Sequence, residues 1–78
     1  MSNVAKKVLA AMPGDYKYED MPIENDDIMK WCEKVSKLDG VTTNTLETKI
    51  AELGAGPPNT KSKAHRVNQV FQHYATAV

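Results

Sequence analysis

A run of helix-breaking residues in the C-terminal half constrains the fold of this chain more than any other feature. After Leu53 the chain reads Gly-Ala-Gly-Pro-Pro-Asn-Thr, ending at Thr60. Glycine enters backbone conformations that other residues avoid, and proline cannot continue a helix because it lacks the backbone N–H. Apolar residues recur at helical spacing on both sides of this run. We therefore predict two helices joined by a loop over residues 54–59.

Both helices that flank this loop have predicted ends and apolar faces. Asn44 is the predicted N-cap of the first helix, which ends at Leu53. The second helix is predicted to have Asn59 or Thr60 as its N-cap and to end near Ala75. The apolar positions of the first helix are Leu46, Ile50, Ala51 and Leu53. Those of the second helix are Ala64, Val67, Val70, Phe71 and Tyr74.

The N-terminal half contains two further apolar stripes at helical spacing. The first ends at Pro13-Gly14 and consists of Val4, Val8, Leu9 and Met12. The second consists of Ile28, Trp31, Cys32, Val35 and Leu38. We predict that Asn25 caps this second helix and that Gly40 ends it. Residues 15–22 are predicted to be irregular.

These elements predict an all-α protein: one small domain over residues 1–78, with three or four helices and a helix-turn-helix-like C-terminal half. A chain of 78 residues has a thin hydrophobic core. Cys32 is its single cysteine, so the chain forms no internal disulfide. Small chains without a disulfide rely for stability on helix packing or on a partner subunit, and a homodimer would supply such a partner.

The sequence carries no recognisable catalytic, cofactor or membrane signature. His65 and His73 are eight residues apart, too far around a helix to share a metal ion. Gly54-Ala55-Gly56 lacks the Gly-Lys-Ser/Thr ending of a phosphate-binding loop. The longest uncharged apolar stretch, residues 8–14, is too short to span a membrane or to act as a secretory core. We expect a cytoplasmic protein that is not an enzyme and uses no metal, cofactor or membrane.

Charge is distributed unevenly along the chain. Ten basic and ten acidic residues cancel overall. Residues 1–40 contain six lysines against eight acidic residues, a net charge of −2, whereas residues 41–78 have four basic and two acidic residues, a net charge of +2. No Asp or Glu follows Glu52. The last predicted helix is therefore suited to meet an anionic partner.

A capped helix with a basic and amide-rich solvent face is one way in which small domains meet DNA. Arg66 can bind guanine bidentately and Gln69 can bind adenine, while Lys61 and Lys63 suit phosphate. The candidate DNA-binding residues are Asn59, Thr60, Lys61, Ser62, Lys63, His65, Arg66 and Gln69. The alternative is that these are ordinary solvated positions of an amphipathic helix.

About twenty residues also resemble a known family. Gly40, Thr45-Leu46-Glu47, Ile50, Leu53-Gly54-Ala55-Gly56 and Pro58-Asn59-Thr60 are similar to the N-terminal helix-turn-helix of KfrA-type plasmid DNA-binding proteins. Pro57 stands where that family has serine, and Lys61 where an aliphatic residue is usual. The resemblance implies binding of double-stranded DNA through the helix after Thr60, as in a transcription regulator of a mobile element such as a plasmid or phage.

A second hypothesis concerns an acidic segment in the N-terminal half. Its carboxylates are Asp15, Glu19, Asp20, Glu24, Asp26 and Asp27. They are interleaved with aromatic residues, so the segment can engage a basic protein surface or mimic a nucleic acid backbone. The chain would then be a small phage or mobile-element inhibitor of a host protein. The residues predicted to bind that protein are Tyr16, Tyr18, Glu19, Asp20 and Glu24. A solvated loop with helix-capping acids is the alternative.

Overall fold

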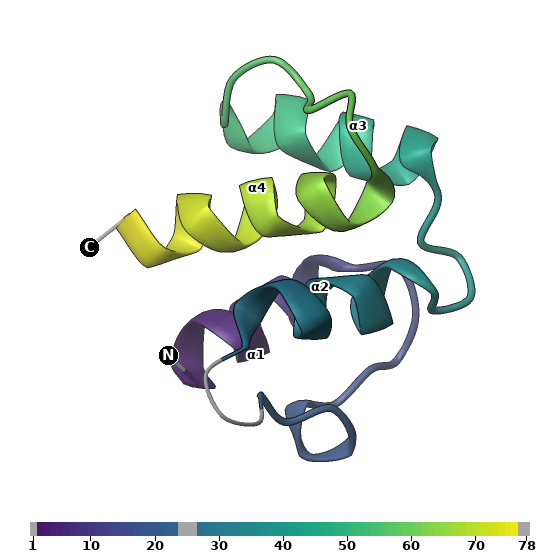
Figure 1. The fold of residues 1–78 in the computed structure, drawn as a ribbon, viewed down its shortest axis with the longest axis vertical. Coiled ribbons are helices and arrows are strands. Elements are labelled where there is room, and N and C mark those ends of the chain that lie inside the picture. Colours follow the sequence, from purple (N-terminus) through teal and green to yellow (C-terminus); the bar gives the residue numbers. More distant parts are fainter. Residues whose placement is uncertain (1, 24–26, 77–78) are drawn as a thin grey trace.

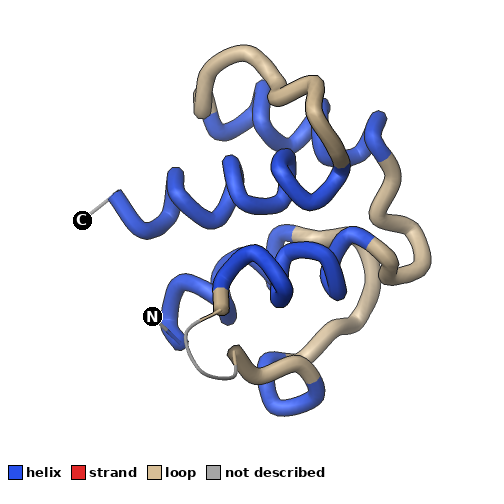
Figure 2. The backbone as a smooth tube through the Cα atoms, in the orientation of Figure 1, coloured by secondary structure: helices blue, strands red, loops and turns tan. Residues whose placement is uncertain are grey.

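The computed structural model describes residues 2–23 and 27–76. This part of the chain contains four α-helices, one short 3-10 helix and no strand, which confirms the predicted all-α class. The elements are α1 (Ser2–Ala11), η1 (Tyr18–Asp20), α2 (Ile28–Ser36), α3 (Thr43–Leu53) and α4 (Lys63–Thr76) (Figures 1 and 2). None of the described helices has the length and apolar character needed to cross a membrane.

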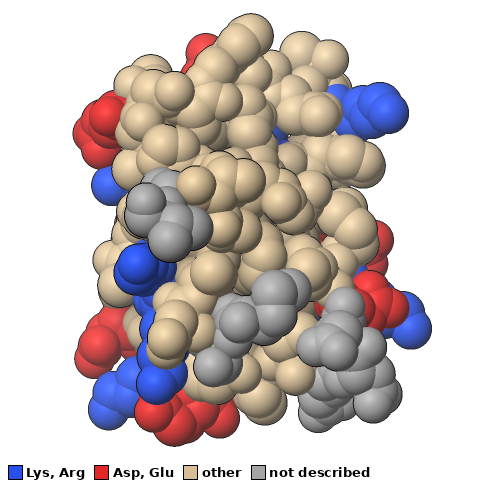
Figure 3. Space-filling model, turned by 90° about the vertical axis from the view of Figure 1, so that its left-hand side faces the viewer, with Lys and Arg blue, Asp and Glu red and all other residues tan. Residues whose placement is uncertain are grey.

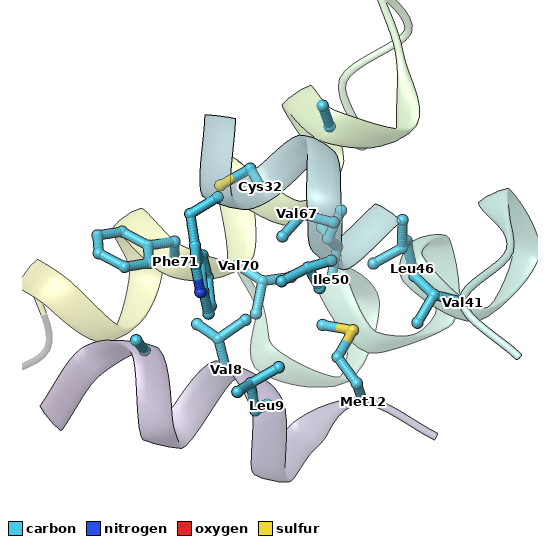
Figure 4. Packing of buried hydrophobic residues seen from close by; sticks show 14 residues of the cluster. Val8, Leu9, Met12, Cys32, Val41, Leu46, Ile50, Val67, Val70 and Phe71 are labelled. Atoms are coloured by element: carbon cyan, nitrogen blue, oxygen red, sulfur yellow. The ribbon is translucent and has the colours of Figure 1, made fainter. Parts of the chain in front are cut away.

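α4 is the central helix, since it packs against α1, α2 and α3. The Phe71 ring of α4 meets the Trp31 ring of α2 edge-to-face, with centroids 5.9 Å apart and planes at 65°. The Trp31 indole N–H donates to the backbone carbonyl of Met21 at 2.6 Å, which attaches the segment before α2 to the core. Buried side chains of all four helices converge around α4 in Figure 4.

Most of the predicted core is confirmed. The predicted residues that are buried are Val8, Leu9, Met12, Trp31, Cys32, Val35, Leu46, Ile50, Ala64, Val67, Val70 and Phe71. The half-buried ones at the margin are Val4, Ile28, Leu38, Leu53 and Tyr74. Ala51 was wrongly assigned to the apolar face: it is exposed, because it lies about 100° around α3 from the buried Ile50. Val41 is buried although it precedes α3.

The start of α3 differs from the prediction. The Thr42 hydroxyl accepts the backbone N–H of Thr45 at 3.2 Å, and the Thr45 hydroxyl accepts that of Thr42 at 2.8 Å. This reciprocal pair satisfies two amides at the helix start, so α3 begins at Thr43, one residue before the predicted cap Asn44. Gly54 ends α3 as predicted, with a φ of +67°.

α4 begins at Lys63, later than the predicted start at Asn59 or Thr60. The Asn59 side chain accepts the N–H of Lys61 at 2.8 Å, which closes a local turn instead of opening a helix. The Ser62 hydroxyl accepts the N–H of His65 at 3.2 Å and so makes the contact typical of an N-cap. The loop between α3 and α4 therefore spans nine residues, 54–62.

The predicted ends of α2 also need correction. The Asp27 carboxylate accepts the N–H of Lys30 at 3.1 Å and caps the helix. The predicted cap Asn25 lies outside the described residues. α2 ends at Ser36, and Gly40, with a φ of +84°, shapes the turn that follows rather than the helix end. Only glycine adopts such a φ without strain.

The segment after α1 is irregular apart from η1, as predicted. η1 packs against α1, and the Lys6 ammonium lies 5.8 Å from the centre of the Tyr18 ring. The Tyr16 hydroxyl donates to the backbone carbonyl of Asp39. The segment is therefore held both by α1 and by the loop that leads to α3.

Candidate nucleic-acid interface

α3 and α4 begin at the same end of the molecule. The Lys63 ammonium donates to the Val41 carbonyl at 3.2 Å, and Nη1 of Arg66 donates to the Thr43 carbonyl at 3.0 Å. The Thr43 carbonyl belongs to the first residue of α3 and the Val41 carbonyl lies just before it, and both helices run in the same direction across Figure 1. Because the N-terminus of a helix carries a partial positive charge, two such ends reinforce each other here.

The loop from 54 to 62 is held against α4 by two side chains of that helix. Nε of Arg66 donates to the Asn59 carbonyl at 2.7 Å, while Oε1 of Gln69 accepts the Asn59 N–H at 2.9 Å. Nε2 of Gln69 donates to the carbonyls of Pro57 at 2.7 Å and Ala55 at 3.2 Å. The loop is thus fixed at three backbone positions.

This arrangement bears on the two residues predicted to read bases. The Arg66 side chain is only 15% exposed, and its Nη1 also lies 3.5 Å from the Glu47 carboxylate. Both ends of the Gln69 amide are bonded to the loop. Little of either side chain remains for a base edge, so in this structure they position the loop.

The other predicted DNA-binding residues gather at the start of α4. Thr60, Lys61 and Ser62 are exposed, whereas Asn59, Lys63 and His65 are half-buried. The Lys61 ammonium has no ion-pair partner among the described residues. The Ser62 hydroxyl contacts Nδ1 of His65 at 2.7 Å in addition to capping the helix. The positive end of α4 therefore offers one unpaired lysine beside several polar groups.

Beyond its first turns, the outer face of α4 is polar and uncharged apart from its histidines. With the start of the loop it lines an open hollow whose residues are Gly54, Ala55, Asn59, His65, Asn68, Gln69, Gln72, His73 and Thr76. Asn68 was not among the predicted site residues, although its spacing of three and four from His65 and Gln72 is the signal that places all three on one helical face. None of the described residues that line this hollow carries a carboxylate.

Charge is sorted between faces of the molecule. The two acidic residues of the C-terminal half, Glu47 and Glu52, both border a hollow on the outer side of α3. Lys61, Lys63 and Arg66 all lie at or before the first turns of α4. Figure 3, which looks at the end where α4 finishes, shows a broad middle surface without charged side chains and charges mainly at its margins. Three of the four basic residues of this half are therefore gathered near the start of α4, where the Glu47 carboxylate pairs with Arg66.

A further hollow lies between the end of α1 and α3. Its lining residues are Ala11, Met12, Pro13, Asn44, Thr45, Thr48, Lys49 and Glu52. The two charged side chains among them, Lys49 and Glu52, are paired with each other at 3.1 Å. This hollow consequently presents no net charge to an ionic ligand.

The acidic segment has a mixed exposure. Asp15, Glu19 and Asp20 are exposed, but Tyr16 and Tyr18 are half-buried and support the segment from within. Of the other predicted acids, Asp27 caps α2, while Glu24 and Asp26 lie outside the described residues. The described carboxylates of this segment are thus more exposed than its two tyrosines, apart from the capping role of Asp27.

The single cysteine is buried, and the described part of the chain holds no cluster of metal-binding side chains. Cys32 is fully buried, and this burial raises the pKa of its thiol to about 12. A thiol with so high a pKa is protonated at neutral pH and is a poor nucleophile. No group of three His, Cys, Asp or Glu residues is placed to hold a metal ion there.

Comparison with known proteins found no match: no family model, curated protein or solved structure matches this chain. The resemblance of residues 40–60 to KfrA-type proteins thus stays a prediction.

Proposed function

We propose that this chain binds double-stranded DNA through the start of α4, as a small transcription regulator of a mobile element. The observation that carries the proposal is the common end of α3 and α4, where two helix N-termini lie near Lys61, Lys63 and Arg66. Helix N-termini and lysines are the groups that hold phosphate in protein–DNA complexes.

Each group at this end has a separate role in the proposal. Lys61 is exposed and contacts phosphate directly, and Lys63 contributes its half-buried ammonium from the first turn of α4. Arg66 and Gln69 act as positioning residues, since they fix the loop that carries Lys61. DNA approaches on the α4 side, where Glu47 is paired with Arg66, while Glu52 borders the outer side of α3.

The test is a titration of fluorescently labelled random duplex DNA, read by anisotropy at several salt concentrations. Each phosphate contact contributes about −0.9 to the slope of log affinity against log salt. We expect Lys61→Ala with Lys63→Ala to weaken binding and to make this slope shallower by roughly two units.

A matched control removes two exposed lysines elsewhere. Lys34→Ala with Lys37→Ala changes the net charge equally but at the end of α2, where neither lysine has an ion-pair partner among the described residues. If the two double variants lose binding to the same extent, the attraction is general and α4 is not the interface. If the wild-type protein binds no duplex at low salt, the proposal is wrong.

A second candidate function is binding of a basic host protein by the acidic segment. The observation in its favour is that Asp15, Glu19 and Asp20 are exposed and form no ion pair among the described residues, on a segment that Tyr16 and Tyr18 hold in place. This function requires that Glu19→Lys with Asp20→Lys abolishes binding of a purified partner while Lys61→Ala does not.

A homodimer is also proposed, because many helix-turn-helix proteins bind two half-sites as dimers and because a chain of 78 residues has a thin hydrophobic core. Sedimentation velocity over a range of protein concentrations measures this directly. A monomer at concentrations that saturate DNA contradicts it.

A further inference from the structure

Three side-chain amides lie near one another on α4, but they differ in what they contact. Gln69 is bonded to the loop through both its oxygen and its nitrogen. Asn68 and Gln72 contact each other, with Nε2 of Gln72 3.4 Å from Oδ1 of Asn68. Among the described residues, Nδ2 of Asn68 and Oε1 of Gln72 have no hydrogen-bond partner. These two amides therefore retain both donors and acceptors for a ligand.

The chemistry of a free amide is specific. Its carbonyl and NH₂ groups lie side by side, which matches the N6 donor and N7 acceptor of adenine in the major groove of DNA. Asn68 is half-buried and Gln72 is exposed, and both line the hollow whose described lining residues include no carboxylate. The chemistry of this hollow therefore suits the neutral edge of a base better than a phosphate.

The position of the pair on α4 fits the same partner. Gln72 lies about two helical turns beyond His65, a rise of about 10 Å. That rise spans roughly three base-pair steps of about 3.4 Å. Lys63 lies about 180° around α4 from Gln72, and its ammonium is turned towards the Val41 carbonyl. Lys61 belongs to the loop before α4 and is exposed, so it is the lysine whose phosphate contact is compatible with base contacts further along the helix.

We propose that Asn68 and Gln72 contact adenine bases in the major groove and set the sequence preference of α4, in place of Arg66 and Gln69. This inference rests on the proposed DNA-binding function and adds the residues and the base that give it specificity.

The experiment selects bound duplexes from a random pool with the wild-type protein. The selected duplex is then titrated by anisotropy beside a shuffled duplex, against the wild type and Asn68→Ala with Gln72→Ala. Asn3→Ala is the matched control, because it removes an exposed amide from α1. In a second arm, 7-deazaadenine replaces adenine in the selected duplex and so removes the N7 acceptor.

We expect the wild type to prefer the selected duplex by about tenfold or more and Asn3→Ala to keep that preference. The double variant is expected to bind both duplexes equally, with the salt slope of the wild type. 7-Deazaadenine is expected to weaken the wild type but not the double variant. A double variant that keeps the preference overturns the inference, as does a wild type that binds DNA without any preference. If the wild type binds no DNA, the proposed function fails as well.

Discussion

Oε1 of Gln69 accepts the backbone N–H of Asn59 at 2.9 Å, across ten residues of sequence. The same side chain donates to the carbonyls of Pro57 and Ala55. The backbone of the nine-residue loop forms no helix, so its N–H and C=O groups lack helical partners. The Gln69 side chain bonds three of these groups. The loop has a defined shape because α4 supplies its missing partners.

Gln69→Ala is expected to destabilise the fold by about 1–3 kcal/mol, because it leaves backbone groups of the loop without partners. Urea unfolding followed by the fluorescence of the buried Trp31 measures this change. Gln72→Ala is the matched control: it is the same substitution three residues along α4, at an exposed position. It should change the free energy of unfolding by less than about 0.5 kcal/mol. Equal effects of the two substitutions would contradict the assigned role of Gln69.

Arg66 joins the loop to α3, and its geometry predicts that lysine cannot replace it. Nε bonds the Asn59 carbonyl while Nη1 bonds the Thr43 carbonyl. A lysine ammonium is a single point and does not span two carbonyls in this way. We expect Arg66→Lys to lower the free energy of unfolding by about 1–2 kcal/mol in the same urea assay.

The ion pair of Arg66 with Glu47 is expected to matter much less. The Glu47 side chain is 58% exposed, and exposed ion pairs contribute about 0–1 kcal/mol. Glu47→Gln keeps the shape of the side chain and removes only its charge. If Glu47→Gln is as harmful as Arg66→Lys, the ion pair and not the two carbonyl contacts fixes the loop.

The helices of this chain were predictable because their signals are local. The stripe that contains Trp31, Cys32 and Val35 repeats at the helical period, and these side chains are buried as expected. The ends of the helices were less predictable. Several neighbouring residues can act as caps. Thr42 is the cap instead of Asn44 because the Thr45 hydroxyl accepts the Thr42 N–H while the Thr42 hydroxyl accepts the Thr45 N–H.

The candidate site shows a different limit of sequence reasoning. Spacing alone placed Gln69 on the solvent side of α4, but spacing does not reveal that a loop folds back over that side. Arg66 likewise gains its partners from residues 59 and 43, which become neighbours only in the folded chain. By their spacing, Asn68 and Gln72 lie on the same solvent side of α4 as Gln69, yet the loop does not cover them. Which polar residues stay free is therefore a property of the tertiary structure.

The buried thiol of Cys32 predicts how stability depends on pH. Burial raises its pKa from 9.0 to about 12 in the folded chain, so the folded state keeps its proton at pH values where the unfolded state loses it. Stability from this group is complete below pH 9 and is lost as the pH rises from about 9 towards 12. The measurement compares the wild type with Cys32→Ala by urea unfolding at each pH, so that the difference between the two proteins isolates the contribution of the thiol. We expect the free energy of unfolding to fall more steeply with pH in the wild type, and parallel curves for the two proteins would contradict the prediction.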